Sequence, residues 1–474
     1  MCLKRILCLK LLCLLLISCK STSQTVAEKP NIILIMADDQ GWGDTGYNGH
    51  PFLKTPNLDK MAKNSLRLDR FYAGAPVCSP TRASVMTGRT PMRTKVLNHG
   101  HYMRPQEETI AEALKRAGYV TGHFGKWHIG SVQKQSPVSP GNSGFDEWIS
   151  APNYYDIDPY LSKNGNAQRF KGESSNLTVD WTVDFIKRKA KGEAPFFAIC
   201  WFSAPHWPFE VLPPDTEMYK GKKNPGYFQE ITVMDREIGR IRKALRDNGV
   251  ADNTLVWFCS DNGGLAVESS GGREKKGSIY EGGLRVPCLI EWPAKIKPAR
   301  NASPTITSDI YPTLLELVGI KPSHSHPLDG ESLMPLVNGK SFTRKDGMGF
   351  WHHFTNGQST YSDRIVKEIM EKQQKGVDIA IPYRIRKDID EFKQYSMTSF
   401  PGHAAYTLWP YKVHRIEKGK KVTFELYNLI KDPMEAKNLI DLEKEKAGEM
   451  KAILDKWQKS VINSLNGKDY KNTK

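Results

Sequence analysis

Residues Asn31–Ala37 read Asn-Ile-Ile-Leu-Ile-Met-Ala, and the acidic pair Asp38-Asp39 follows them directly. A short run that is apolar at every position is typical of a strand buried on both faces, as in a parallel sheet covered by helices. Two further apolar runs, Pro195–Phe202 and Thr254–Cys259, flank a segment with helical periodicity at Phe228–Asn248. Strands that alternate with helices indicate an α/β fold, doubly wound around a large, mostly parallel sheet.

The character of the sequence changes after about residue 345. Tyr406–Ile416 and Lys421–Leu429 are separated by Glu417-Lys418-Gly419-Lys420, which is typical of a β-hairpin. Asp441–Val461 has the periodicity of a terminal amphipathic helix. We therefore predict a smaller C-terminal subdomain with a short antiparallel sheet and a terminal helix.

The start of the chain has the features of an export signal. Two basic residues precede the apolar run Ile6–Ile17, which is too short to span a bilayer. The run ends Leu16-Ile17-Ser18-Cys19, which resembles a bacterial lipobox and implies cleavage before Cys19 with a lipid on its sulfur. An ordinary cleaved signal is the alternative. Either reading predicts an exported protein, periplasmic or at the cell surface. The predicted divisions of the chain are a signal peptide at 1–18, a polar tether at 19–29, a large α/β domain at 30–345 and the C-terminal subdomain at 346–474.

The composition narrows the class of protein without deciding it. The chain has 474 residues, 39% of them hydrophobic, and a formal net charge of +16, which falls to +13 when the three basic residues within 1–18 are removed. This apolar content excludes a wholly disordered chain, and the basic balance favours an anionic partner. No helical DNA-reading motif or aromatic RNA-binding signature is present, so we do not expect nucleic acid to be that partner.

Carboxylates follow two of the predicted strands. Asp38 and Asp39 come after the first strand, and Asp261 and Asn262 come after the strand at Thr254–Cys259. Ligands of such sheets bind where the strands end. Three carboxylates and an amide oxygen form an oxygen-only ligand set that suits Ca²⁺ or Mg²⁺. The alternative is that both clusters simply cap turns.

Cys78 stands apart from the other cysteines of the predicted mature domains. Cys200, Cys259 and Cys288 lie in apolar, strand-like runs, where small buried thiols are expected. Cys78 instead lies in the string Cys78-Ser79-Pro80-Thr81-Arg82, which we interpret as a polar turn. A cysteine near an arginine is compatible with an activated thiolate nucleophile, although so short a string also occurs by chance.

Basic side chains also follow predicted strands. Lys126 and His128 come after the strand that ends near Phe124, His206 follows Pro195–Phe202, and Lys276 lies further along the chain. Each one alone is commonly a solvated loop residue. Together at several strand ends, they would surround an anion with donors and supply a general acid and a general base.

Taken together, these motifs resemble the formylglycine-dependent sulfatases of the arylsulfatase type, within the alkaline phosphatase superfamily. The resemblance implies an alkaline-phosphatase-like fold and hydrolysis of sulfate monoesters. Export and a basic surface make a sulfated carbohydrate the expected substrate. The matching segments are Asn31–Gly41, Cys78–Arg89, Gly125–Gly130, Asp261–Gly264, Lys276–Pro287 and Glu425–Leu429 with Asp432-Pro433.

The resemblance also implies a nucleophile and a metal. A separate maturation enzyme would oxidise Cys78 to formylglycine, because the pattern Cys78-x-Pro80-x-Arg82 is intact. Serine commonly replaces this cysteine in related enzymes, which favours a modified residue over a thiolate. The implied ligands of one Ca²⁺ are Asp38, Asp39, Asp261, Asn262 and the converted Cys78.

Roles for the basic residues follow from the same resemblance. Arg82 would position the hydrated aldehyde, and Lys126 and Lys276 would bind sulfate oxygens. His206 would protonate the leaving alcohol, and His128 would take the proton that allows sulfate to be expelled.

Some alternatives and one segment stay open. A phosphoester or phosphonate hydrolase could use the same scaffold, and a lipoprotein could bind sulfated glycans without cleaving them. The segment Trp351–Pro401, with a charged helix expected at Asp363–Gln374, is one that we do not match to a common pattern of the family. It could shape the substrate pocket, with His352, His353 and His403 as candidates.

Overall fold

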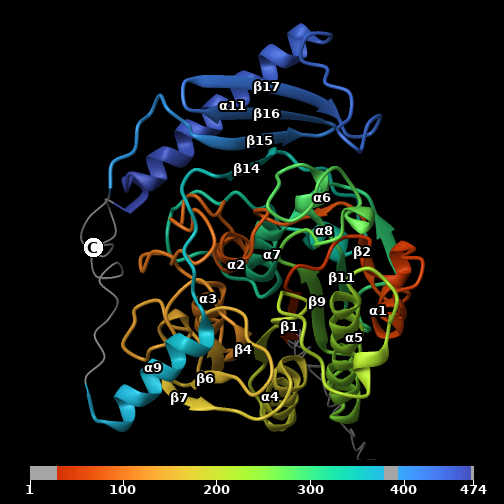
Figure 1. Ribbon diagram of the computed structural model, residues 1–474, viewed down its shortest axis with the longest axis vertical. Helices are drawn as coiled ribbons and strands as arrows, with labels where there is room; N and C mark the ends of the chain where they lie inside the picture. Colours follow the sequence, from red (N-terminus) through yellow and green to blue (C-terminus); the bar gives the residue numbers. More distant parts are fainter. Residues whose placement is uncertain (1–28, 378–392, 471–474) are drawn as a thin grey trace, which may run out of the picture.

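The large domain is built on one sheet of 10 strands. In the computed structural model, which describes residues 29–377 and 393–470, this sheet lies between two layers of helices (Figure 1). At its centre β1 (Asn31–Ala37) pairs in parallel with β8 (Phe196–Trp201) on one side and β9 (Thr254–Ser260) on the other. β4 (Val120–Lys126) and β5 (Glu147–Ala151) continue the parallel order. The remaining strands of the sheet are β2 (Leu66–Leu68), β11 (Cys288–Glu291), β12 (Ala299–Asn301), β6 (Tyr160–Lys163) and β7 (Asn166–Arg169).

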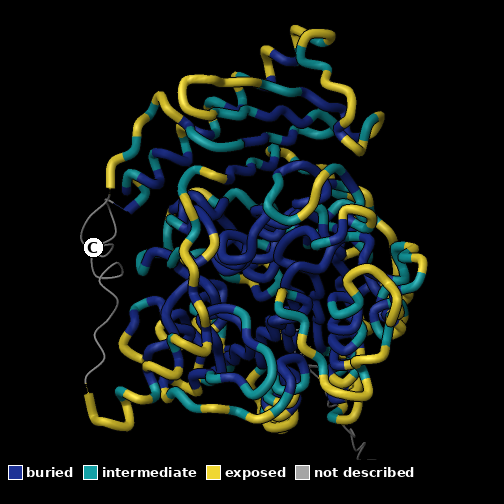
Figure 2. The backbone as a smooth tube through the Cα atoms, in the orientation of Figure 1, coloured by how far each residue is buried: buried dark blue, intermediate teal, exposed yellow. Residues whose placement is uncertain are grey.

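Both faces of β1 are buried, as its unbroken apolar sequence predicts. Ile32, Leu34 and Met36 pack into one core cluster, and Ile33 and Ile35 pack into the cluster on the opposite face. Figure 2 shows the resulting buried interior, with exposed residues on the outer helices and loops. The first cluster is covered by α2 (Cys78–Thr87), α3 (Ile110–Arg116) and α7 (Ile310–Leu317), and the second by α1 (Pro56–Ala62), α4 (Ser174–Lys189) and α5 (Pro225–Asp247). The predicted α/β fold is therefore confirmed.

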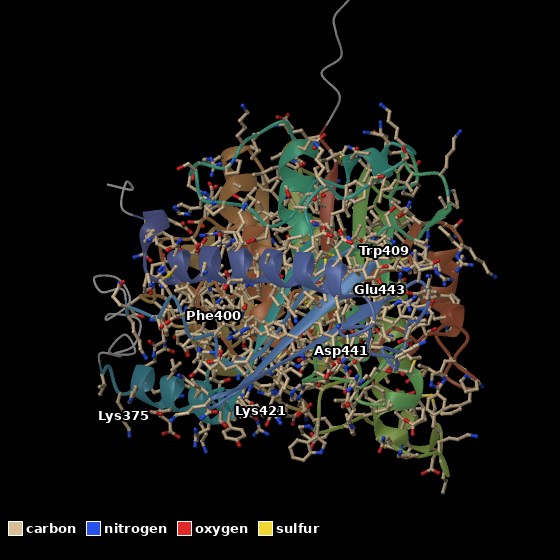
Figure 3. All side chains as sticks on the ribbon, turned by 90° about the horizontal axis from the view of Figure 1, so that it is seen from above. Lys375, Phe400, Trp409, Lys421, Asp441 and Glu443 are labelled. Carbon is tan, nitrogen blue, oxygen red and sulfur yellow. The ribbon has the colours of Figure 1, made fainter. Side chains whose placement is uncertain are left out.

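A second, antiparallel sheet carries the C-terminal part of the chain. Its order is β14 (Met348–His352), β15 (Gly402–Leu408), β16 (Tyr411–Lys418) and β17 (Lys421–Asn428), and the long helix α11 (Lys444–Leu465) lies against β15 and β16. Figure 3 shows α11 running across these strands. The short antiparallel sheet and terminal helix of the prediction are confirmed. The other short elements are α6 (Glu281–Leu284), α8 (Met334–Val337), β3 (Phe71–Tyr72), β10 (Arg285–Val286) and β13 (Thr305–Ile306).

One predicted strand of this sheet is wrong. Tyr406–Ile416 is not continuous, because a turn at Trp409-Pro410 separates β15 from β16. Pro410 has no N–H to donate to the ladder, so a strand cannot run through it in the middle of a sheet.

The charged helix expected at Asp363–Gln374 is α9 (Ser362–Gln374), and it belongs to the edge of the large sheet rather than to the small one (Figure 1). Its residue Gln373 accepts a hydrogen bond from the Ala167 N–H at 2.9 Å and donates one to the Gly165 carbonyl at 2.7 Å. Val366 and Ile369 are buried in the core of the large domain. Only the polar face of this helix meets solvent.

Within residues 29–377 and 393–470, no helix combines the length and the apolar character needed to cross a bilayer. The predicted signal peptide, the lipobox at Cys19 and all but the last residue of the tether lie outside the described residues.

Candidate active site

The predicted site residues meet at the edge of the sheet where the central strands end. Asp38 follows β1, Lys126 is the last residue of β4, and Asp261 follows β9. Cys78 faces them from the first position of α2, so our interpretation of this segment as a polar turn is wrong. Pro80 does not prevent the helix, because N–H groups in the first turn have no intrahelical partner.

Three carboxylates and three cations pair with one another in this site. Lys126 Nζ lies 2.5 Å from Asp38 Oδ2, and Lys276 Nζ lies 2.6 Å from Asp39 Oδ2. Arg82 donates from Nε and Nη2 to Asp261 Oδ2, at 3.1 and 2.7 Å. All six residues but Lys276 are buried, and the Lys276 side chain is 22% exposed. Lys276 is therefore the cation with the most open approach from solvent.

The surroundings shift the pKa values of Asp38 and Asp261 in opposite directions. Burial alone would raise the pKa of Asp38, but Lys126, His206 and Arg82 outweigh it and hold that pKa below its ordinary range. Burial and the charge of Asp38 raise the pKa of Asp261 to about 7 despite Arg82. Two neighbouring acids that cannot both ionise easily indicate a place where one more positive charge would be stabilised.

The same place also holds unpartnered oxygen atoms. Asp38 Oδ1 and Asn262 Oδ1 are buried without a hydrogen-bond partner, whereas Asn262 Nδ2 donates to Asp39 Oδ1 at 2.7 Å. One oxygen each of Asp38 and Asp261 and Cys78 Sγ lie within 4.8 Å of one another. Buried acceptors without partners are costly, and carboxylate and amide oxygens are the ligands that Ca²⁺ prefers. These residues fit a bound divalent cation.

Cys78 does not have the environment of a thiolate nucleophile. Burial raises the pKa of its thiol even though Lys126 and Lys276 act in the opposite direction. Reactive cysteines require a lowered pKa, because the thiolate is the attacking species. The thiolate interpretation that the sequence left open is therefore disfavoured. Cys200, Cys259 and Cys288 are buried free thiols in β8, β9 and β11.

Two histidines complete the site. His128 has a φ of 60°, its Nδ1 is buried without a partner, and its Nε2 lies 3.3 Å from Thr360 Oγ1. His206 Nε2 lies 3.9 Å from Asp39 Oδ2, and its ring stacks on Tyr154 with centroids 4.7 Å apart. Burial lowers the pKa of both imidazoles, most strongly that of His128. The neutral His128 is therefore suited to accept a proton.

A cavity of about 340 Å³ opens onto these groups. It is lined by Cys78, His128, His206 and Lys276 together with residues that the sequence did not indicate. The further lining residues are Val77, His99, Asn153, Tyr154, Trp207, Ser359, Thr360 and Tyr361. The unmatched segment thus reaches the pocket through residues 359–361, and no motif or periodicity in the sequence marks them.

The histidines proposed from the unmatched segment do not line this cavity. His352 and His403 face each other across β14 and β15, and His352 packs against His353. His403 Nε2 lies 2.9 Å from His414 Nδ1, within the small sheet. None of the three lines the cavity directly, so their part in shaping the substrate pocket stays a prediction.

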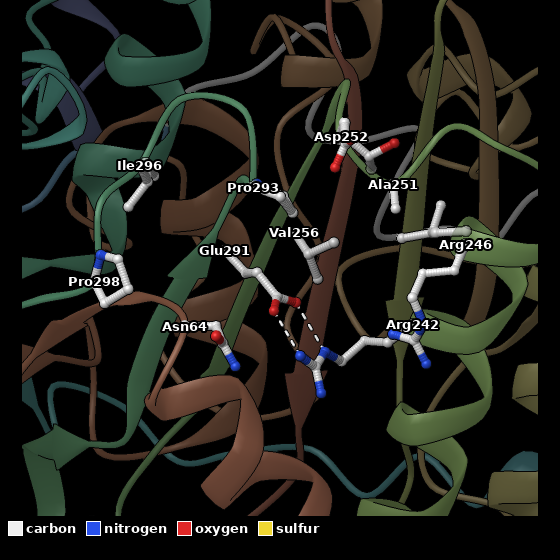
Figure 4. Close-up of a pocket in the computed structure, with 12 residues that line it drawn as sticks. Asn64, Arg242, Arg246, Ala251, Asp252, Val256, Glu291, Pro293, Ile296 and Pro298 are labelled. Carbon is white, nitrogen blue, oxygen red and sulfur yellow. Dashed lines mark hydrogen bonds and ion pairs between the residues drawn. The ribbon is translucent and has the colours of Figure 1, made fainter.

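A second cavity, of about 380 Å³, lies near the start of β9, at the opposite end of that strand from Asp261 (Figure 4). Its most buried charges, Arg242 and Glu291, form a double ion pair at 2.6 and 2.8 Å. These two charges satisfy each other, and Arg246 is a further cation that lines this cavity.

Buried cations, a cluster that fits a divalent cation and two histidines at the carboxyl ends of a doubly wound sheet suit a hydrolase of anionic esters with an alkaline-phosphatase-like fold. The sequence profile described as Sulfatase matches residues 30–320, and that described as N-sulphoglucosamine sulphohydrolase, C-terminal, matches residues 272–398. The second profile covers most of Trp351–Pro401, so the prediction that this segment has no counterpart in a family pattern is wrong. The chain belongs to the sulfatase family and is a sulfuric ester hydrolase.

Named relatives and solved structures agree with this assignment. The chain is 33% identical over 367 residues to N-acetylgalactosamine-6-sulfatase of Canis lupus familiaris, covering 67% of each protein. It is 30% identical over 353 residues to an ulvan-active sulfatase of Formosa agariphila, covering 68% of each. The crystal structure of Ps i-CgsB in complex with k-i-k-neocarrahexaose superposes with a TM-score of 0.74 and 25% identity, over 91% of this chain and 93% of that one.

Proposed function

We propose that this protein releases inorganic sulfate from a sulfated saccharide, using formylglycine formed from Cys78 and one bound Ca²⁺. The observation that carries the proposal is the pair of unpartnered oxygens, on Asp38 and Asn262, in a cluster that includes Cys78 and three buried or partly buried cations. The saccharide is supported by the relatives, whose names or bound ligand specify an amino sugar, ulvan and a carrageenan-type oligosaccharide.

The proposed ion would be held by Asp38, Asp39, Asp261, Asn262 and the converted Cys78. When bound, Ca²⁺ lowers the pKa of a coordinated hydroxyl and offsets the charge of the sulfate. The hydrated aldehyde supplies one hydroxyl as the nucleophile and a second through which sulfate can leave. Conversion requires a separate maturation enzyme, and the Cys78-x-Pro80-x-Arg82 pattern that such an enzyme would recognise is intact.

The chain's own residues then bind the ester and move protons. Lys276, which lines the cavity, and Lys126, which is buried against Asp38, would bind the sulfate oxygens. Arg82, fixed by Asp261, orients the nucleophile. His206 donates a proton to the leaving alcohol oxygen as the sulfur–oxygen bond breaks, and the Asp39 carboxylate, 3.9 Å from its Nε2, favours the protonated ring against the effect of burial. His128 accepts a proton from the second hydroxyl, for which its unpartnered Nδ1 is available.

We also propose that the protein works outside the cytoplasm, in the periplasm or at the cell surface, with a lipid on Cys19. The support is the N-terminal sequence alone, in which an apolar run ends at Leu16-Ile17-Ser18-Cys19. Blocking prolipoprotein cleavage should shift the mass of the mature N-terminus. A mature chain without lipid that begins elsewhere would contradict the anchor.

The catalytic proposal is tested by turnover of p-nitrophenyl sulfate and p-nitrophenyl phosphate after co-expression with a maturation enzyme. We expect sulfate turnover to exceed phosphate turnover and to be abolished by Cys78→Ala. Cys200→Ala is the matched control, because it removes a buried thiol that packs on the opposite face of the sheet from α2, the helix that begins at Cys78. A stronger phosphatase activity that depends on Cys78 would favour the phosphoester or phosphonate hydrolase. Glycan binding without sulfate release by matured protein would favour a non-catalytic binding lipoprotein.

A further inference from the structure

The outer wall of the active-site cavity is made by three separate segments that share a pattern. In each segment an aromatic residue lines the cavity and a carboxylate follows two or three positions later. Two or three residues of extended chain span at most about 7 to 11 Å, so each carboxylate stays near the cavity wall. The three pairs are Tyr154 with Asp156, Trp207 with Glu210, and Tyr361 with Asp363.

Hydrogen bonds and a ring contact join these segments to one another and to His128 and His206. The Asn153 N–H donates to Ser362 Oγ at 2.9 Å, which joins the first segment to the third. The Tyr155 N–H donates to Ser203 Oγ at 2.8 Å, which joins the first segment to the loop that carries His206. Tyr154 stacks on the His206 ring, and Thr360 contacts His128. The wall therefore has a fixed position relative to the sulfate-binding groups.

Asn153 presents an unsatisfied polar atom to this cavity. Its side chain lines the cavity, the residue is 9% exposed, and its Oδ1 has no hydrogen-bond partner. A buried carbonyl oxygen without a donor is costly, and a ligand hydroxyl or amine would satisfy it. The exposed rings of Trp207 (63%) and Tyr361 (51%) offer apolar faces beside it, which suit the apolar face of a sugar ring.

The carboxylates next to the aromatic wall interact electrostatically, because Glu210 and Asp363 act on Asp156. Burial, Glu210 and Asp363 raise the pKa of Asp156 to about 8, and burial raises that of Asp363. Glu230 lies behind Glu210, whose N–H it accepts at 2.9 Å through Oε1, and its Oε2 is buried without a partner. Asp363 accepts the Tyr160 N–H at 3.3 Å and lies near Arg169. Because Asp156 with this raised pKa is largely protonated at neutral pH, Glu210 and Asp363 carry the negative charge that would repel a further anion. A hydroxyl or a cationic amine would find acceptors at the same wall.

We propose that Asn153, Tyr154 and the carboxylates of Asp156, Glu210 and Asp363 form the subsite for the sugar that bears the sulfate ester. This subsite takes a sugar whose other substituents are hydroxyl or amino groups, and it discriminates against one with a second sulfate or a carboxylate near the ester. The inference rests on the proposed function, because it assigns the substrate class of the same site.

Charge selectivity is tested with three aryl sulfates of similar size: p-nitrophenyl sulfate, 4-carboxyphenyl sulfate and 4-(trimethylammonio)phenyl sulfate. Variants are compared with wild type on each substrate, so that differences in leaving-group reactivity cancel. We expect Glu210→Gln, and more strongly the triple variant Asp156→Asn, Glu210→Gln and Asp363→Asn, to lower KM for the carboxy substrate. The triple variant should change the ratio of the anionic to the cationic KM by about tenfold, with kcat nearly unchanged. Asp441→Asn, which removes an exposed carboxylate before α11, is the control (Figure 3).

The hydrogen-bonding role is tested with Asn153→Ala on a panel of monosulfated galactose and glucosamine substrates. We expect KM for the best of these sugars to rise about tenfold, while KM for p-nitrophenyl sulfate, which has no hydroxyl, changes less than about twofold. Equal effects on both substrates, or KM ratios that the carboxylate variants leave unchanged, would overturn the subsite. Turnover of p-nitrophenyl sulfate without turnover of any sugar would also overturn it. If matured wild type hydrolysed none of these sulfates, the proposed function itself would be contradicted.

Discussion

A buried ion network joins the small sheet to the large domain, and its central residue is Lys412 on β16. The Lys412 side chain is fully buried, and its Nζ lies 3.1 Å from Glu281 Oε1 and 3.1 Å from Glu435 Oε1. Glu435 also accepts the Glu281 N–H at 2.6 Å, at the start of α6. Replacing Lys412 with methionine would keep the apolar stem and remove the charge that holds two buried carboxylates together.

The size of the effect follows from what is left behind. Removing one partner of a buried ion pair costs about 3–5 kcal/mol, because the remaining charge has no compensation. A protein is stable by only about 5–15 kcal/mol in total, so Lys412→Met should lower the free energy of unfolding by a large fraction of its value. The pair Lys412→Met with Glu435→Gln should cost less than the sum of the single changes, by about 1–3 kcal/mol, because the second change removes one of the two stranded charges.

The assay is urea unfolding followed by tryptophan fluorescence and by circular dichroism. Lys421→Met is the matched control, because Lys421 is an exposed lysine on the neighbouring strand β17 (Figure 3). We expect the control to stay within about 0.5 kcal/mol of wild type. A Lys412→Met midpoint equal to that of the control would refute the reasoning, as would strictly additive effects in the double variant.

Three further outcomes follow from the site and its surroundings. His206→Gln should reduce kcat on a sulfated sugar by about 10²–10⁴-fold. The same variant should reduce kcat on p-nitrophenyl sulfate far less, because a nitrophenolate leaves without a proton. Equal losses on the two substrates would argue against His206 as the acid. Removal of divalent cations with EDTA should lower the midpoint of thermal unfolding, because Asp38 and Asp261 lose the ion that stabilises both charges. Added Ca²⁺ should restore the midpoint in wild type but not in Asp261→Asn. A midpoint that EDTA does not change would count against the ion. Burial lowers the pKa of His326 from 6.5 to about 4, so the unfolded chain binds the proton more readily and stability is lost as the pH falls from 6.5 towards 4. His326→Phe should make the unfolding midpoint less dependent on pH in that window, and an unchanged dependence would exclude His326 as its source.

The sequence predicted the fold and the site best where an apolar strand is followed directly by charged residues. The run Asn31–Ala37 predicts a doubly buried strand from its composition alone, and parallel strands must end at a common edge. That geometry explains why Asp38, Lys126 and Asp261, which are far apart in the chain, could be assigned to one site before the structure was known.

The errors arose where tertiary packing decides the outcome. Cys78 begins a helix because its segment covers the sheet, although its sequence contains the turn residues Ser79 and Pro80. Asn153 and Thr360 reach the cavity from loops that lack periodicity, and the hydrogen bonds that position those loops, such as Asn153 to Ser362, link residues about 200 positions apart. His352 and His403 lie opposite each other in the small sheet, and this pairing of β14 with β15 could not be foreseen from the sequence.

The central claim is that sulfate ester hydrolysis depends on a modified Cys78, and mass spectrometry of the peptide containing Cys78 tests it most directly. The protein is purified after expression with and without a maturation enzyme, and the turnover of p-nitrophenyl sulfate is measured on the same samples. We expect the aldehyde, which has lost the sulfur of Cys78, only in the matured sample, with activity proportional to its fraction. Full activity in protein whose Cys78 is entirely unmodified thiol would contradict the account.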